Sequence, residues 1–540
     1  MEFQFANAWE VIADTIPDSP ALICGDEVRT WREYDERAAR IAAALTAGGL
    51  GPDAKVGIYL HNCNEYLETQ YATFKMRGCP INVNYRYKAE ELVYLLDNAD
   101  AEAVVYQSCY AARIWEIQAR LPKVKLFIEV ADGTENIPVK GRVDYEATIR
   151  SQTPMPRIER RADEVYMLYT GGTTGMPKGV MYPNGQMCMA FMAGAFAARG
   201  MEPPLSLADL PAKVRELHAQ GLAPISLAAC PLMHGTGMWL GAMMPLLAGG
   251  TAVTISALGL DPDVIWDHVQ RLGITDMAIV GDAFAKPLLG ALDAAQQNAR
   301  PFKIQSLRRI ISSGVMFSTE VKRGLLAHHD MTLHDAMGST EGGMASSVAT
   351  RDSVLETAKF TLSPGVKVFT DDGAEVQAGS DQIGKVATSG MVPLGYYKDP
   401  KKSAETFREI DGVRYSFPGD YATVAADGTI TLLGRGSQCI NTAGEKVFPE
   451  EIEEIVKQHP AIYDCLVVGV PDQRFGERVV AVASLRQNET ASAADVIEFT
   501  RARVAGYKVP KVVLLVDEVR RAANGKADYK WAKQAALEEL

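Results

Sequence analysis

Several features that would point to other classes of protein are missing from this chain of 540 residues. Its eight cysteines form no C-x-x-C pair and no Cys/His cluster with zinc spacing, which argues against a zinc site or a disulfide framework. They are scattered through mostly apolar segments, so we expect reduced core thiols in a cytoplasmic protein. The formal charge is −12, and this lack of basic excess argues against nucleic acid as a partner.

A long apolar run that could cross a membrane is also lacking. No Asp, Glu, Lys or Arg occurs from Leu217 to Leu260, but Pro224, Pro231, Pro245 and a Gly-Gly pair interrupt that stretch. A spanning helix needs about 20 continuous apolar residues. We therefore expect no integral membrane association, and we predict a buried strand, loop and helix that line an apolar pocket. The N-terminus has neither the basic region nor the apolar region of a signal peptide.

What is present is an ordinary globular composition, with 47% hydrophobic and 23% charged residues. Short β-rich runs such as Lys55 to Leu60 and Val165 to Leu168 alternate with amphipathic stretches such as Glu36 to Ala47 and Glu90 to Asn98. This alternation predicts an α/β fold, and the length allows two or more domains. We expect a large multi-subdomain N-terminal body with stacked sheets and a small mobile α/β C-terminal domain.

The domain boundary is predicted where two glycines flank Arg435, just after an apolar run that ends at Leu433. Beyond it, Pro449 with two following glutamates opens a helix in the favoured way, because proline suits the first turn and acidic side chains suit the positive end of the helix dipole. This places the body at residues 1–434 and the cap at 435–540, with a hinge near 435–438.

The segment from Tyr169 to Val180 is rich in glycine and threonine and follows the apolar run at 165–168. Its glycines allow the backbone to approach a ligand closely, its hydroxyl and N–H groups can donate to phosphate oxygens, and Lys178 adds a positive charge. The spacing matches neither a Walker loop nor a G-x-G-x-x-G fingerprint. The segment therefore predicts a different polyphosphate cradle.

This string closely resembles the signature of the AMP-forming adenylating enzymes, the superfamily of acyl-CoA synthetases, peptide-synthetase adenylation domains and luciferases. Further strings match that superfamily in order, and the resemblance covers nearly the whole chain. They are Cys230 to Gly237, Ser312 to Met316, Met337 to Glu341, Pro418 to Asp420, Arg435, the post-hinge segment Gly444 to Pro449, and Gly525 with Lys526.

The resemblance implies a site for ATP with Mg²⁺. Asp420 would bind the ribose hydroxyls, and Arg435 would assist at the ribose and phosphate. Glu341 and Thr174 would hold Mg²⁺, since hard cations prefer oxygen ligands. The implied nucleotide and coenzyme A contacts are Thr170, Gly171, Gly172, Thr173, Thr174, Gly175, Lys178, Ser313, Gly314, Val315, Met337, Gly338, Ser339, Asp420, Arg435, Gly444 and Lys446.

The catalytic group implied by the resemblance is Lys526, whose charge would bridge the substrate carboxylate and the α-phosphate. Thr340 and Glu341 would act beside it at the phosphates, and His234 would border the carboxylate site and the path of coenzyme A. The substrate pocket is expected to include His234, Met238, Trp239, Gly281, Asp282 and Ser312.

The chain departs from the family pattern in two places. The family usually has an aromatic residue four positions before the glutamate, where it stacks on adenine, and this chain has Met337 there. A thioether can still pack on a purine face. At the hinge, Ser437 and Gln438 replace the usual Lys-Asp pair, but a hinge depends on soft backbone torsions more than on one side chain.

The implied reaction joins a small-molecule carboxylic acid to AMP and then transfers the acyl group to coenzyme A. The segment from Arg199 to Gln220 resembles insertions in ligases for steroid side chains and fatty acids, and small or flexible residues near Gly241 favour a bulky hydrophobic acid. An aryl-CoA ligase, an acyl-AMP ligase that loads a carrier protein, and a degenerate ATP sensor are the alternatives. The sequence leaves the oligomeric state open, a homodimer included.

Overall fold

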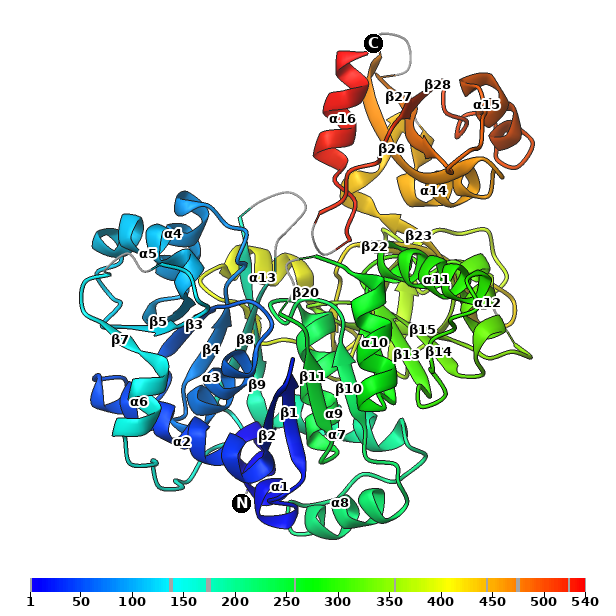
Figure 1. Ribbon diagram of the computed structural model, residues 1–540. Coiled ribbons are helices and arrows are strands. Elements are labelled where there is room, and N and C mark those ends of the chain that lie inside the picture. The colour runs from blue at the N-terminus through cyan, green and yellow to red at the C-terminus, as the bar shows by residue number, and fades with distance from the viewer. Residues whose placement is uncertain are drawn as a thin grey trace.

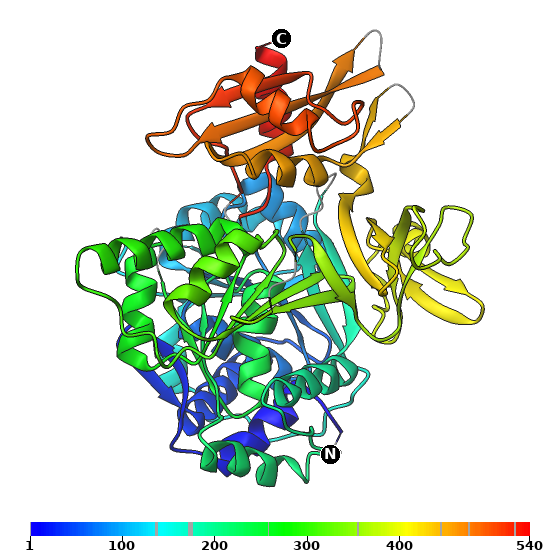
Figure 2. The same cartoon turned by 90° about the vertical axis from the view of Figure 1, so that its right-hand side faces the viewer.

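The computed structural model describes residues 2–135, 139–170, 176–256, 259–353, 356–442, 445–472, 476–522 and 525–539. The chain forms a large lower body and a smaller C-terminal lobe, which is orange to red in Figure 1 and lies on one end of the body (Figures 1 and 2). The predicted α/β class is confirmed, because parallel strands and helices alternate through most of the body.

The strands of the largest sheet come from the whole length of the body, from close to the N-terminus to just before the C-terminal lobe. Its first half is mostly parallel and its second half antiparallel. In spatial order its strands are β2 (Glu27–Thr30), β1 (Pro20–Cys24), β11 (Thr251–Thr254), β10 (Ile225–Ala228), β12 (Asp276–Ile279), β13 (Arg309–Ser313), β14 (Thr332–Ser339), β15 (Gly342–Ala349), β16 (Lys359–Leu362), β23 (Thr429–Arg435), β22 (Asp420–Val424), β18 (Gly384–Thr388), β21 (Val413–Ser416) and β20 (Phe407–Ile410), with β17 (Val366–Phe369) beside β18.

Two smaller sheets complete the body. One is parallel and contains β4 (Cys79–Asn82), β3 (Lys55–Tyr59), β5 (Ala101–Gln107), β6 (Leu126–Val130) and β7 (Arg142–Asp144). The other contains β19 (Gly395–Tyr396), β9 (Lys178–Pro183) and β8 (Val165–Thr170).

The helices of the body cover these sheets (Figure 1). They are α1 (Phe5–Thr15), α2 (Trp31–Ala47), α3 (Asn64–Lys75), α4 (Ala89–Asn98), α5 (Ala111–Ile117), α6 (Tyr145–Ser151), α7 (Asn184–Ala197), α8 (Leu210–Ala219), α9 (Met244–Leu247), α10 (Pro262–Leu272), α11 (Gly281–Gln297), α12 (Thr319–His328) and α13 (Pro400–Thr406). Helix α2 begins earlier than the predicted Glu36, because Thr30 and Glu33 form a capping box that fixes its first turn.

The C-terminal lobe has a sheet of its own. Its strands are β25 (Glu445–Val447), β24 (Ile440–Thr442), β27 (Gly476–Leu485), β26 (Ile462–Asp472) and β28 (Val512–Val516), and its helices are α14 (Pro449–Lys457), α15 (Ala493–Arg501) and α16 (Tyr529–Glu538). A short 3-10 turn, Gly436–Gln438, joins β23 of the large sheet to β24 of this one. The boundary predicted at 434/435 lies next to this change of sheet, and both the division into two domains there and the rotation of the lobe stay predictions.

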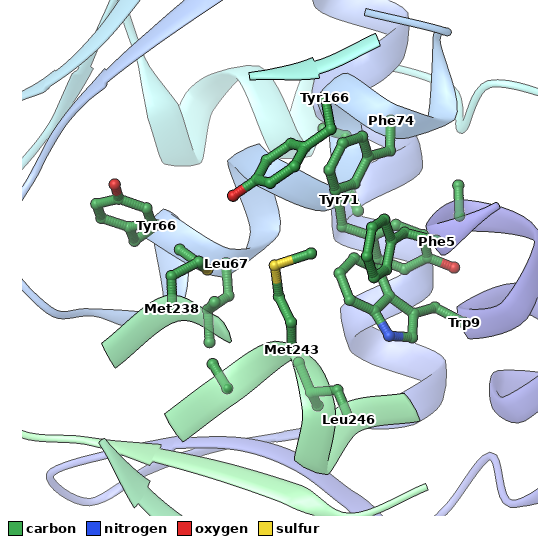
Figure 3. Close-up of a cluster of buried hydrophobic side chains, with 14 of the residues drawn as sticks. Phe5, Trp9, Tyr66, Leu67, Tyr71, Phe74, Tyr166, Met238, Met243 and Leu246 are labelled. Atoms are coloured by element: carbon green, nitrogen blue, oxygen red, sulfur yellow. The ribbon is translucent and has the colours of Figure 1, made fainter. Parts of the chain in front are cut away.

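The uncharged stretch from Leu217 to Leu260 forms part of the body's core. It contains β10, a π-helix (η3, Thr236–Met243), α9 and β11, and it agrees with the predicted strand, loop and helix. Figure 3 shows Met238 and Met243 of this stretch among aromatic side chains such as Trp9 and Tyr166. No helix in the described part of the chain is both long enough and apolar enough to span a bilayer.

The eight cysteines are all free thiols. Five of them are buried, as predicted for core thiols, but Cys109 is exposed and Cys24 and Cys439 are half-buried. The segment from 199 to 220, expected as an insertion, carries helix α8, which packs against α1.

A buried ion cluster fixes helix α1 to the rest of the body. The Arg160 guanidinium donates to both carboxylate oxygens of Glu10 at 2.9 Å, and the Lys75 ammonium donates to the same carboxylate at 2.8 Å. All three side chains are almost fully buried. Removal of one partner therefore leaves the buried charges of the cluster less fully compensated.

We predict that Arg160→Ala lowers the free energy of unfolding by about 3–5 kcal/mol, because the Glu10 carboxylate would stay buried with one cation fewer. Urea denaturation of the full chain measures this. The matched control is Arg32→Ala, which breaks an exposed pair with Asp18 and should cost less than about 1 kcal/mol. Equal losses in the two variants would contradict this account of the cluster.

Candidate active site

Two neighbouring cavities lie between the body and the C-terminal lobe, and Lys526 lines both. The first has a volume of about 350 Å³ and is bordered by the His234 turn, the π-helix and the ends of β13 and β14. The second has a volume of about 280 Å³ and extends from the β14–β15 turn to β22, β23 and α14. We call the first the apolar cavity and the second, after the ligand predicted from the sequence, the nucleotide cavity.

The apolar cavity has mostly hydrophobic walls, including Phe191, Trp239 and Val280. Lys526 is the only charged side chain among the described residues that line it. The Trp239 indole N–H donates to the Tyr166 hydroxyl at 3.0 Å, which fixes the ring at one side of the cavity. One cation in apolar surroundings is the arrangement expected for a ligand with a carboxylate and a hydrophobic body.

His234 lies in the same cavity and is held in its neutral form. Burial lowers the pKa of its imidazole to about 3, and the positive charges of Lys526 and Arg86 add to the effect. The neutral ring can accept or donate a hydrogen bond, but it carries no charge near pH 7. Its surroundings therefore favour a role in positioning a substrate rather than in proton transfer.

The nucleotide cavity contains a carboxylate suited to a diol. Asp420 is buried, and its Oδ2 has no hydrogen-bond partner in the structure, while its Oδ1 lies 3.4 Å from the Arg435 Nε. Burial raises the pKa of Asp420, and Arg435 opposes that shift. Two neighbouring hydroxyl groups, as in a ribose, would supply the missing donors.

Thr340 and Glu341 form the turn between β14 and β15. A bulge between Met337 and Gly338 shifts the register of this hairpin, and Met337 itself is buried on the wall of the nucleotide cavity. The Glu341 carboxylate accepts a hydrogen bond of 2.8 Å from the Tyr396 hydroxyl, and the Thr340 carbonyl accepts one of 3.0 Å from Tyr182.

Lys526 reaches the junction of the cavities from the loop before α16. Burial lowers the pKa of its ammonium, with Arg435 adding to the shift and with Glu341 and Asp420 opposing it, although the side chain stays accessible from the cavities. The preceding Gly525 has φ +74°, and a Cβ there would lie 2.7 Å from the Cβ of Ala283. This glycine permits the close approach between the loop and helix α11.

Helix α11 forms a second contact with the C-terminal lobe. The Lys286 ammonium donates to the Tyr463 carbonyl at 2.8 Å. It also lies 3.7 Å from Asp282. The Lys286 bond to Tyr463 and the Gly525 contact join the lobe to α11 in the orientation that places Lys526 at the two cavities.

Most of the predicted nucleotide residues that the structure describes converge here. Those lining one or both cavities are Thr170, Ser313, Gly314, Val315, Met337, Gly338, Ser339, Thr340, Glu341, Asp420, Arg435 and Lys526. Lys178 forms an ion pair with Asp399. Lys446 lies elsewhere, 3.6 Å from Asp371, and Gly171, Gly172, Thr173, Thr174, Gly175 and Gly444 lie outside the described residues.

Of the predicted substrate residues, only His234 and Trp239 line the apolar cavity. Met238 points into the aromatic core instead (Figure 3). Ser312 is fully buried behind the cavity and accepts a hydrogen bond of 2.8 Å from the Gly281 N–H. Asp282 borders a separate cleft, where its carboxylate accepts from the Ser318 N–H at 2.8 Å.

Three residues at the site were not predicted. Glu450 lines the nucleotide cavity, where burial raises its pKa to about 7 and its Oε1 accepts from the Arg435 N–H at 3.4 Å. Asp399 caps helix α13, and the Asp-Pro pair at its start is the signal that could have identified it. Tyr396 offers no such signal, because its partner Glu341 is distant in sequence.

Comparison with known proteins places the chain among relatives of the same length. It matches the AMP-binding enzyme family over residues 9–397 and the C-terminal domain of AMP-binding enzymes over residues 451–526. The chain therefore belongs to the AMP-binding enzyme family. This confirms the predicted superfamily and the prediction that the protein is an enzyme.

Among curated relatives, the 3-oxocholest-4-en-26-oate–CoA ligase of Rhodococcus rhodochrous is 39% identical, with 99% of this chain and 96% of the relative covered. A medium/long-chain-fatty-acid–CoA/3-oxocholest-4-en-26-oate–CoA ligase of Mycolicibacterium smegmatis is 38% identical, with 100% and 97% covered. The fold resembles the ATP-bound MatB from Rhodopseudomonas palustris, with a TM-score of 0.78, 24% identity and full coverage of both chains.

We predict that the His234 ring does not titrate between about pH 5 and pH 8, because burial and nearby cations keep it neutral. Its ring-proton NMR signals, identified by their loss in His234→Asn, should keep their positions across that range. A midpoint within that range would contradict the lowered pKa of His234. Since the unfolded ring binds a proton near pH 6.5, the stability that the neutral ring contributes is lost as pH falls from about 6.5 toward 3.

Proposed function

We propose that this chain is an AMP-forming acyl-CoA ligase that activates a bulky, hydrophobic carboxylic acid, such as a fatty acid or the side-chain acid of a steroid. The observation that carries the proposal is the single cation, Lys526, among the described residues that line an otherwise uncharged cavity beside the cavity that contains Asp420 and Arg435. The printed activities of the relatives that share 38–39% of their residues with this chain support the same class of acid.

In the first half-reaction the carboxylate of the acid attacks the α-phosphorus of ATP, which gives acyl-AMP and pyrophosphate. Both reactants are anionic, so a positive charge between them lowers the barrier and orients the attack. Lys526 lies where the apolar and nucleotide cavities meet, and it is the group that supplies this charge. Asp420 grips the ribose, and Met337 packs on the adenine face.

Magnesium fits this site as a cation shared with the phosphates of ATP. Glu341 offers one carboxylate beside the nucleotide cavity, and Thr174 of the phosphate loop is the proposed second oxygen ligand. No group of three acidic, histidine or cysteine side chains that could hold a metal by themselves occurs among the described residues. A site with one carboxylate suits Mg²⁺, because this ion is usually bound by one or two carboxylates and takes its other ligands from phosphate and water. When bound, the ion neutralises the departing pyrophosphate.

In the second half-reaction the thiolate of coenzyme A attacks the acyl carbon and releases AMP. We propose that the C-terminal lobe rotates about residues 435–438 between the two steps, which withdraws Lys526 and presents another face of the lobe. The turn at Gly436–Gln438 supports this proposal, because it is a single short connection between two sheets. The cytoplasmic location of the protein stays a prediction.

We predict that Lys526→Ala lowers the rate of acyl-AMP formation by about 100-fold or more and leaves the affinity for ATP within a few-fold, because its charge acts mainly in the transition state. Pyrophosphate release and ATP binding are measured separately. Lys530→Ala, which removes an exposed lysine of helix α16, serves as the control. Full activity of the Lys526 variant would exclude this residue from the mechanism.

A panel of acids tests the proposed substrate class. Pyrophosphate release is measured for each acid with and without coenzyme A. Long-chain fatty acids and steroid side-chain acids should give the highest kcat/KM, because the apolar cavity removes hydrophobic surface from water. Acetate or benzoate as the best substrate would overturn the acid assignment. Product formation that requires a carrier protein in place of coenzyme A would favour the acyl-AMP ligase alternative.

A further inference from the structure

Asn82 lies at the point where the three sheets of the body meet. It is the last residue of β4 in the parallel sheet, and it lines the apolar cavity. Beside it, β8 of the three-stranded sheet ends at Thr170, the second residue of the glycine- and threonine-rich segment 169–180. The turn that carries His234 follows β10 of the large sheet.

The Asn82 side chain bonds to both of these segments and uses its whole amide. Its Oδ1 accepts from the Tyr169 N–H at 2.7 Å, and its Nδ2 donates to the Tyr169 carbonyl at 2.9 Å and to the Met233 carbonyl at 2.7 Å. Tyr169 is the first residue of the glycine- and threonine-rich segment 169–180, and Met233 directly precedes His234. One planar group therefore sets the distance between the start of that segment and the His234 turn.

The His234 turn does not depend on Asn82 alone for its shape. Asn62, in the loop that follows the neighbouring strand β3, donates to the Cys230 carbonyl at 3.1 Å and accepts from the Leu232 N–H at 2.8 Å. Loss of the Asn82 bonds should therefore leave the turn attached to the parallel sheet. What would be lost is the position of the turn relative to Tyr169.

We propose that Asn82 is a positioning residue for the adenylation step, which aligns the acid beside His234 with the nucleotide beside Thr170, the residue after Tyr169 that lines both cavities. The inference rests on the proposed function, because it assumes that acid and ATP react across these two segments. Small errors in the alignment of reacting groups are costly, since a displacement of about 1 Å can lower a rate by about 100-fold. Transfer from acyl-AMP to coenzyme A does not need this alignment, because the acyl group and AMP are already joined.

The decisive variant is Asn82→Asp, which has the same shape but replaces both N–H donors by a carboxylate oxygen that faces two carbonyls. We expect the kcat of pyrophosphate release to fall by about 10–100-fold at saturating ATP and acid. Thioester formation from supplied acyl-AMP and coenzyme A should stay within about twofold of the unaltered enzyme. Asn82→Ala, which leaves space in place of a repulsive charge, is measured in parallel in case the aspartate variant fails to fold.

The matched control is Asn98→Asp. The Asn98 Oδ1 accepts a hydrogen bond of 2.7 Å from the Tyr169 hydroxyl, and a carboxylate can accept the same bond, so both half-reactions should be unchanged. Unchanged adenylation in a folded Asn82 variant, or an equal loss in both half-reactions, would overturn the positioning role. If the unaltered enzyme released no pyrophosphate with any acid, the proposed function itself would fail, which separates the two results.

Discussion

The position of one ammonium group between two cavities is the constraint on which the rest of the site depends. A carboxylate and a triphosphate repel each other, so a reaction between them needs a cation that reaches both. Lys526 meets this need only while the C-terminal lobe is seated on helix α11, where Gly525 approaches Ala283 and Lys286 bonds to the Tyr463 carbonyl. The few contacts between the C-terminal lobe and the body therefore control whether Lys526 reaches the two cavities.

The two cavities differ in a way that matches two kinds of ligand. The apolar cavity offers hydrophobic walls and, among its described residues, one charge. The nucleotide cavity holds several acidic groups, and burial raises the pKa of Asp420 and Glu450. Such groups suit hydroxyls and a shared cation more than bare phosphate. In the proposed function, the glycine-rich segment, Lys178 and magnesium are therefore the groups left to bind the polyphosphate.

The resemblance of ordered motifs to the adenylating superfamily predicted Asp420, Arg435 and Lys526 as site residues. The structure brings these three residues together at the nucleotide cavity, while their roles stay predictions. Proximity in sequence was a poorer guide to the acid pocket. Met238 and Trp239 are adjacent, but the π-helix directs Met238 into the core and Trp239 into the cavity. Asn82 and Tyr396 act through partners that are distant in the chain, and no local pattern reports such pairs.

The most direct test of the shared cation is a crystal structure with a stable acyl-adenylate analogue that carries a long apolar chain. The account predicts that the ribose hydroxyls contact Asp420, that the chain lies beside Trp239, and that the Lys526 ammonium contacts the linkage between them. Binding of the analogue with its chain outside the apolar cavity, or with Lys526 away from the linkage while the lobe is seated on α11, would contradict it.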